Sequence, residues 1–258
     1  LAFATATIGW RPSFVIVAVL AGLSGLIVLW WVSDDPPGTK PSEQKKENFV
    51  ESLRGLVVVT RTPSFWPIFA MFLTSYAVVI TILGLWGGPY LAHVYGYDLD
   101  TRGFYLLLLA LSSMSAAFCW GVADRVFGNY RTPVLIGALL TLAMLVWIAL
   151  AGRMSPAVLV AWFVLYGVVT GYPPLLVGQA REMFPPQLVG RGLTLLNLAT
   201  MGGVFVFQFA TGAVIEFMAP NQTVYPLAAY QAAFWLMAGF LAVSIGCYFL
   251  AGSRRSKN

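Results

Sequence analysis

Residues 104–150 read FYLLLLALSSMSAAFCWGVADRVFGNYRTPVLIGALLTLAMLVWIAL, two long apolar blocks on either side of a short charged turn. Each block is close to the ~20 residues that an α-helix needs to cross ~30 Å of hydrocarbon. All of the charge in this stretch lies in the turn, on Asp124, Arg125 and Arg131. The pattern predicts two membrane-spanning helices joined at one surface of the bilayer.

Apolar blocks of this length recur along the whole chain. The sequence is 59% hydrophobic and 10% charged, whereas a soluble domain carries about 25% charged residues, so a large soluble helical core is disfavoured. Since every backbone polar group must be satisfied within lipid, the sequence predicts an all-α polytopic membrane bundle. Its seven expected spans are Phe14–Val32, Phe65–Leu91, Phe104–Ala123, Pro133–Ala151, Ala157–Gly178, Leu193–Ile215 and Ala228–Ala251.

Lysine and arginine are distributed unevenly over the two sides of this bundle. Counted over alternate connections, 12 lie on one side and 3 on the other. Positive residues collect in cytoplasmic loops, so the richer side, which includes the C-terminus, is expected to be cytoplasmic. The net charge of +5 therefore reflects topology and does not indicate a nucleic-acid partner. We expect an integral protein of a cytoplasmic membrane, such as the bacterial inner membrane.

One long polar stretch separates the first expected span from the other six. It covers residues 32–63, and its proline, glycine and mixed charges are typical of a linker. Phe49, Leu53, Leu56 and Val57 at helical spacing predict a short amphipathic helix on the inner surface. The expected organisation is one span in residues 1–33, a cytoplasmic linker in 34–62, a six-helix bundle in 63–252 and a basic cytoplasmic tail in 253–258.

Polar side chains within the spans follow a period of three. The second, third, fifth and sixth spans carry several each, whereas the first, fourth and seventh carry little. Because polar groups in a bilayer face protein or a water-filled cavity, the polar spans are expected to surround a cavity and the others to face lipid. Each candidate for the cavity either contacts substrate or hydrogen-bonds a neighbouring helix, and both interpretations stay open for Tyr76, Tyr166, Tyr172, Asn197 and Gln208.

The turn at residues 120–131 resembles a motif of the major facilitator superfamily. That family places G-x-x-x-D-R-x-G-R-R in the cytoplasmic loop between the second and third helices of each half. This chain keeps Asp124, Arg125, Gly128 and Arg131. It departs from the pattern at Trp120, which replaces the first glycine, by one extra residue before Gly128, and at Asn129 and Tyr130, where arginines are usual.

A second charged turn, AREMFPPQLVGRG at residues 180–192, is similar to the family's E-x-x-P…R element in Glu182, Pro185 and Arg191. The resemblance covers essentially the whole chain. It implies the last helix of the N-terminal half and the complete C-terminal half of a twelve-helix transporter, which works by alternating access. It also implies a salt-bridged cytoplasmic gate, although the positive-inside rule alone explains the same charges. The gate residues would be Asp124, Arg125, Gly128, Arg131, Glu182 and Arg191.

The expected function is secondary active transport of a small polar organic solute, by symport or antiport, without enzymatic activity, cofactor or metal. The expected partners are this substrate, the lipid bilayer and the N-terminal half of the same transporter. The alternative is a non-transporting scaffold, sensor or assembly subunit of a larger membrane complex. G-x-S-G at Gly22–Gly25 matches a rhomboid-type protease motif, but it falls in a span expected to face lipid. The single histidine, His93, is expected in an outer loop.

Overall fold

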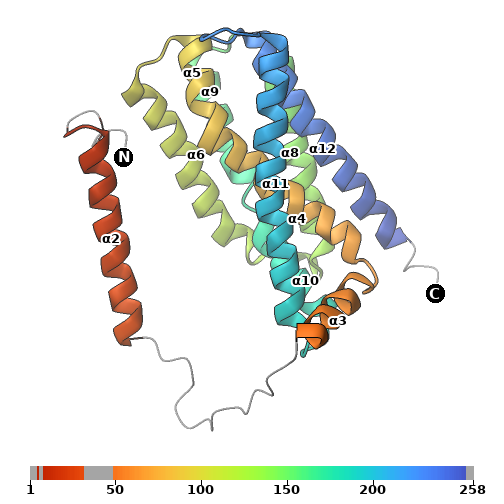
Figure 1. The fold of residues 1–258 in the computed structure, drawn as a ribbon. Helices are drawn as coiled ribbons and strands as arrows, with labels where there is room; N and C mark the ends of the chain where they lie inside the picture. Colours follow the sequence, from red (N-terminus) through yellow and green to blue (C-terminus); the bar gives the residue numbers. More distant parts are fainter. Residues whose placement is uncertain (1–4, 6–7, 32–48, 254–258) are drawn as a thin grey trace. The chain divides into compact units, whose positions relative to one another are not determined.

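The protein is helical throughout the part that our computed structural model describes, which is residues 5, 8–31 and 49–253 (Figure 1). Seven of the described helical segments are long and apolar enough to cross a membrane. The all-α polytopic membrane fold expected from the sequence is therefore confirmed. The segments are Trp10–Trp31, Phe65–Tyr95, Leu99–Trp120, Arg131–Leu150, Pro156–Met183, Val189–Met218 and Leu227–Leu250.

The chain divides into two compact units, Leu1–Ser52 and Leu53–Asn258. The first contains α2 (Trp10–Trp31), the predicted first span. Its hydroxyls are satisfied within the helix, since Ser24 donates to the Leu20 carbonyl at 2.6 Å. Residues 32–48, which hold most of the predicted linker, and the predicted tail from residue 254 lie outside the described residues.

The second unit is a bundle in which two spans are interrupted. The predicted linker helix is present as α3 (Phe49–Thr60), with Val59 buried and Val57 half exposed. The second span comprises α4 (Phe65–Thr81), the π-helical turn η1 (Ile82–Trp86) and α5 (Gly87–Tyr95). The other helices are α6 (Leu99–Trp120), α7 (Ala123–Phe127), α8 (Arg131–Leu150), α9 (Pro156–Val169), α10 (Pro173–Met183), α11 (Val189–Met218) and α12 (Leu227–Ser253).

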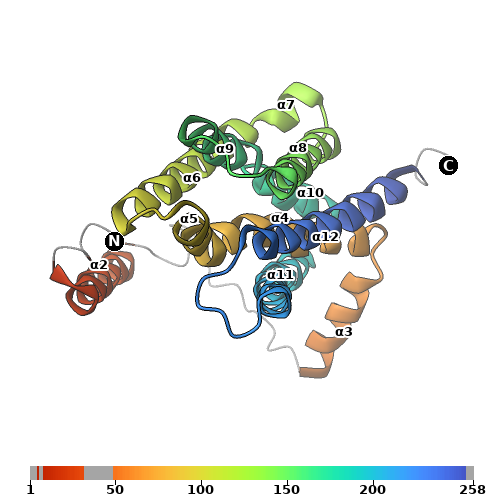
Figure 2. The same cartoon turned by 90° about the horizontal axis from the view of Figure 1, so that it is seen from above.

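Helix α4 lies at the centre of the bundle, in contact with both α11 and α12 (Figure 2). Helix α6 pairs with α9, and α8 pairs with α12. Two of these contacts need glycine, because backbones approach closely where there is no Cβ. A Cβ on Gly203 of α11 would overlap the Leu73 carbonyl of α4, and one on Gly167 of α9 would lie 2.7 Å from the Leu109 oxygen of α6. Gly167 and Gly203 thus permit close packing between neighbouring helices.

The fifth span breaks between α9 and α10, at the proline pair Pro173–Pro174. Because neither proline has an N–H, the carbonyls of Val169 and Thr170, four residues earlier, lose their helical donors. The Thr141 hydroxyl of α8 donates to the Val169 carbonyl at 3.4 Å and supplies one replacement. The Trp120 indole of α6 donates to the neighbouring Val168 carbonyl at 2.9 Å. Side chains of α6 and α8 thus stabilise the break.

Helix α6 begins with a side-chain cap that gives a pH-dependent prediction. Asp98 accepts a hydrogen bond from the Thr101 N–H at 3.0 Å, and this bond holds the pKa of the carboxyl below its ordinary value. A depressed folded pKa stabilises the protein at neutral pH, and this contribution disappears as the pH falls through that pKa. We expect Asp98→Ala to lower the melting temperature in detergent at pH 7 by roughly 1–3 °C.

The difference between wild type and Asp98→Ala should disappear only when the pH falls below the lowered pKa of the Asp98 carboxyl, where the wild-type side chain is also protonated. Asp100 lies in the same first turn but does not supply the cap, so Asp100→Ala is the matched control. An equal loss for both variants at pH 7 would contradict the capping role.

Candidate functional site

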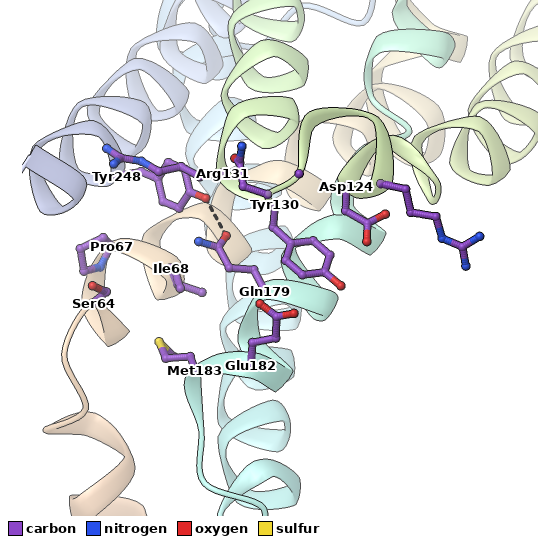
Figure 3. Close-up of a pocket in the computed structure, with 13 residues that line it drawn as sticks. Ser64, Pro67, Ile68, Asp124, Tyr130, Arg131, Gln179, Glu182, Met183 and Tyr248 are labelled. Atoms are coloured by element: carbon purple, nitrogen blue, oxygen red, sulfur yellow. Dashed lines mark hydrogen bonds between the residues drawn. The ribbon is translucent and has the colours of Figure 1, made fainter. Parts of the chain in front are cut away.

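The two charged turns meet at one end of the bundle, around a pocket of about 570 Å³ that we call the charged pocket (Figure 3). Five of the six residues expected to form a gate line this pocket. They come from the α6–α8 connection, the start of α8 and the end of α10. The lining residues are Ser64, Pro67, Ile68, Asp124, Arg125, Gly128, Asn129, Tyr130, Arg131, Gln179, Glu182, Met183 and Tyr248.

The first charged turn owes its shape to Gly128 and Asn129. Gly128 ends α7 with φ of 66°, a left-handed conformation that glycine adopts without steric cost. The side chain of Asn129 then accepts from the Thr132 N–H at 2.8 Å and donates to the Phe127 carbonyl at 2.9 Å. Asn129, which departs from the family pattern, therefore holds the start of α8.

Tyr130 connects the two charged turns. Its ring lies against Gly178 of α10, where an added Cβ would be 2.6 Å from the tyrosine Cε1. The ring sits between the carboxylates of Asp124 and Glu182 (Figure 3). Desolvation by the surrounding protein, together with these two negative charges, raises the pKa of the Tyr130 hydroxyl. The phenol is thus the neutral group placed between the two acids.

Two further contacts tie α12 to this end of the bundle. Arg131 donates to the Phe249 carbonyl at 2.7 Å, and its guanidinium lies 6.0 Å from the centre of the Phe249 ring. Tyr248 donates to the Gln179 side chain of α10 at 2.6 Å (Figure 3). Arg131 is therefore engaged with α12 and not with a carboxylate. The family resemblance implied a salt-bridged gate; among the described residues, Tyr130 makes the link between the turns.

Arg191, the sixth expected gate residue, does not line the charged pocket. Its guanidinium lies against α3, where a Cβ on Gly55 would overlap Nη1 and lie 2.9 Å from Cζ. The first turn of α11 directs this side chain toward the linker helix. Arg191 is thus placed to hold α3 against the bundle.

A second, larger hollow of about 860 Å³ opens between α4, α6, α10 and α11, and we call it the interhelical hollow. Residues of η1 and of the α9–α10 break complete its wall, whereas no residue of α8 or α12 lines it. This agrees with the expectation that the second, third, fifth and sixth spans surround a cavity. Its polar lining residues are Ser75, Tyr76, Ser113, Thr170, Arg181, Asn197 and Thr200.

Of the five residues expected in the cavity, Tyr76 and Asn197 line the interhelical hollow. Tyr166 and Tyr172 are fully buried and pack between helices instead. The Tyr166 ring stacks on Trp162 with centroids 4.7 Å apart, and the Tyr172 hydroxyl donates to Ser75 at 2.9 Å. Tyr172 thereby orients Ser75, which lines the interhelical hollow, without lining the hollow itself.

Gln208, the fifth candidate, is half-buried on α11 and lines neither hollow. It lies two turns beyond Met201, where the lining of the interhelical hollow by α11 ends. The contributions of Ser75, Ser113 and Arg181 had not been singled out from the sequence as site candidates. In the sequence each of them is only a hydroxyl or a cation in the inner half of a span. Many residues that merely pack between helices share this description.

Comparison with known proteins finds a family model that matches part of the chain. A family model described as Major Facilitator Superfamily matches residues 1–122, which run from the first span to the end of α6. The charged residues of both turns and the spans from α8 onward lie outside that match. A search of curated proteins finds no match.

Proposed function

The chain fits part of a Major Facilitator Superfamily transporter, and on this premise we propose that it carries a small polar organic solute across the cytoplasmic membrane by alternating access. Transport would be secondary, by symport or antiport, and the end with the charged pocket would face the cytoplasm. In this proposal the interhelical hollow contributes to the solute path. The charged pocket belongs to the gate that closes its inner end.

The observation that carries the proposal is the composition of the hollow's wall. Four spans line it, and they are the four in which the sequence concentrates intramembrane polar groups. Polar groups at membrane depth are costly unless they face protein or water, and they mark solute pathways in transporters. A volume of about 860 Å³ is in the range of small-molecule sites.

Uptake into proteoliposomes tests the proposal. The natural full-length polypeptide would be reconstituted, and a panel of radiolabelled organic solutes would be offered with and without an imposed proton or sodium gradient. Gradient-dependent accumulation of at least one solute, abolished by an ionophore, is the expected result. Reconstituted protein that moves none of the panel under any gradient would favour the non-transporting scaffold instead.

Asp124→Asn should weaken the inner gate without unfolding the bundle. Losing one partner of a charged interaction costs on the order of 1.5 kcal/mol or more, which corresponds to roughly tenfold slower uptake. The gate is read out separately by labelling Asn197→Cys in the hollow with a membrane-impermeant thiol reagent. Asp124→Asn is expected to increase labelling from the inner side. The exposed natural thiols of Cys119 and Cys247 are first replaced by serine.

The link through Tyr130 gives this prediction an internal control. Tyr130→Phe removes the hydroxyl but keeps the ring against Gly178, so it should slow uptake in the same direction. If Asp124 and Tyr130 act as one unit, the double variant will be no slower than the worse single variant. Unchanged uptake and unchanged labelling in Asp124→Asn would contradict the gate assignment.

A further inference from the structure

The interhelical hollow carries a single charged lining residue in the part of the chain that the structure describes. That residue is Arg181 of α10, and no carboxylate lines the wall. The remaining polar lining groups are hydroxyls and one amide, among them Asn197 and Thr200 of α11. The wall therefore has a net positive charge and neutral hydrogen-bonding groups around it.

Arg181 and Glu182 are neighbours in sequence but lie on different faces of α10. Successive helical residues point roughly 100° apart. Arg181 accordingly lines the interhelical hollow, whereas Glu182 lines the charged pocket. Within the described residues, Arg181 forms no hydrogen bond or ion pair. Its charge is thus not neutralised by Glu182 inside the hollow.

A guanidinium stays protonated at any physiological pH and presents a planar fork of N–H donors. Near a low-dielectric wall, such a charge is stabilised by an anion, and the fork matches the two oxygens of a carboxylate. Apolar side chains make up much of the rest of the wall, with Met114, Met201 and Leu83 among the lining residues. Methionine side chains adapt to ligand bodies of different shape.

From this arrangement, and resting on the transport function proposed above, we propose that the solute is an organic monocarboxylate with an apolar body. Its carboxylate pairs with Arg181 at one end of the hollow. Its body lies against the methionine and leucine side chains, and Asn197 and Thr200 bind any neutral polar substituent. Amines of the same shape are repelled by the positive charge, and amides lose the charge-assisted pair.

Ligand-induced thermal stabilisation of the full-length protein in detergent tests the charge preference directly. The probes are two matched trios, hexanoate with hexanamide and hexylamine, and benzoate with benzamide and benzylamine. At least one carboxylate should raise the melting temperature while its amide and amine do not. Arg181→Gln should weaken that binding about ten- to a hundredfold, and Arg181→Lys should weaken it less, since the charge remains.

Arg61→Gln is the matched control, because Arg61 is an exposed arginine at the end of α3 that lines neither hollow. It should bind the carboxylate like the wild type. If Arg181→Gln does not fold, protection against phenylglyoxal, an arginine-selective reagent, replaces it. The bound carboxylate should then slow modification of Arg181, located by peptide mass mapping, in the wild-type protein.

The outcomes separate this proposal from the transport function itself. Stabilisation by amide or amine as strong as by carboxylate, stabilisation by no probe, or unchanged binding in Arg181→Gln would overturn the monocarboxylate proposal. Tracer uptake of a neutral or cationic solute would then still support transport. Conversely, Arg181-dependent carboxylate binding without uptake would support the site and contradict transport.

Discussion

Replacing Gly203 by alanine is expected to destabilise the bundle by about 1–3 kcal/mol, and replacing it by leucine should prevent folding. Helices α4 and α11 make their closest contact here. An added Cβ would overlap the Leu73 carbonyl oxygen, and it would lie 2.7 Å from the carbonyl carbon and 3.0 Å from Cα. All three are backbone atoms, so rotation of a side chain cannot relieve the overlap. The central helix would have to move away from α11.

The neighbouring glycine supplies the control for this prediction. A Cβ on Gly202 meets no atom within 4 Å, so Gly202→Ala should leave the stability unchanged or slightly increase it through helix propensity. Both variants would be compared by thermal or denaturant unfolding in the same detergent. Equal stability of the two alanine variants would show that the α4–α11 approach does not limit the fold.

The spans were predictable because hydrocarbon thickness fixes the length of an apolar block. Their ends were less so, as the second span shows. The expected end was Leu91, but α5 continues to Tyr95. The helix is capped by Gly96, whose φ is 71°. His93 therefore lies on α5 and not in a loop, so that expectation was wrong. The polar imidazole of His93 follows Leu91 and Ala92 directly, so the apolar run that marks a span stopped short of the end of the helix.

The charged pocket was predictable in part. The resemblance to the family's loop motifs indicated Asp124, Arg125, Gly128, Arg131 and Glu182, which line the charged pocket, and Arg191, which does not. It did not indicate that Tyr130 lies between the acids, since a tyrosine at a helix start is also typical of an interfacial aromatic belt. Which way a side chain points also depends on the rotation of its helix, which short turns do not determine.

The same limit explains the division of the cavity candidates. Tyr76 and Asn197 line the hollow, whereas Tyr166 and Tyr172 lie on the two sides of the break in the fifth span. A break changes the helical phase, so residues that follow the proline pair do not continue the face of residues before it. The sequence indicated which of these residues are polar and how deep in the membrane they lie. It did not indicate which face of the helix each one occupies.

Acidification should release the chain segment before α12 from α5, and the contact responsible is made by His93. Its Nδ1 lies 2.8 Å from the Tyr230 hydroxyl and accepts a hydrogen bond from the Tyr225 N–H at 3.2 Å. The Tyr225 ring packs edge-on to the imidazole, with centroids 5.6 Å apart. A backbone N–H needs a lone pair to accept its proton, so Nδ1 is unprotonated here and Nε2 carries the hydrogen. The imidazolium has no such lone pair.

Protonation of Nδ1 removes this acceptor, and losing the acceptor of a partly buried N–H costs about 1–3 kcal/mol. We therefore expect the protection factor of the Tyr225 amide against hydrogen exchange to fall roughly tenfold or more between pH 7.5 and pH 5. His93→Phe keeps a ring of similar size without an acceptor. Its Tyr225 amide should be poorly protected at both pH values.

The Thr101 amide is the internal control, because its acceptor, Asp98, has a lowered pKa and stays ionised at pH 5. A fall in protection at both amides would indicate general loosening of this end of the bundle. Constant protection of Tyr225 from pH 7.5 to pH 5 in the wild type would contradict the role of His93. A selective fall at Tyr225, absent in His93→Phe, would identify one nitrogen atom as the link between α5 and the segment that leads into α12.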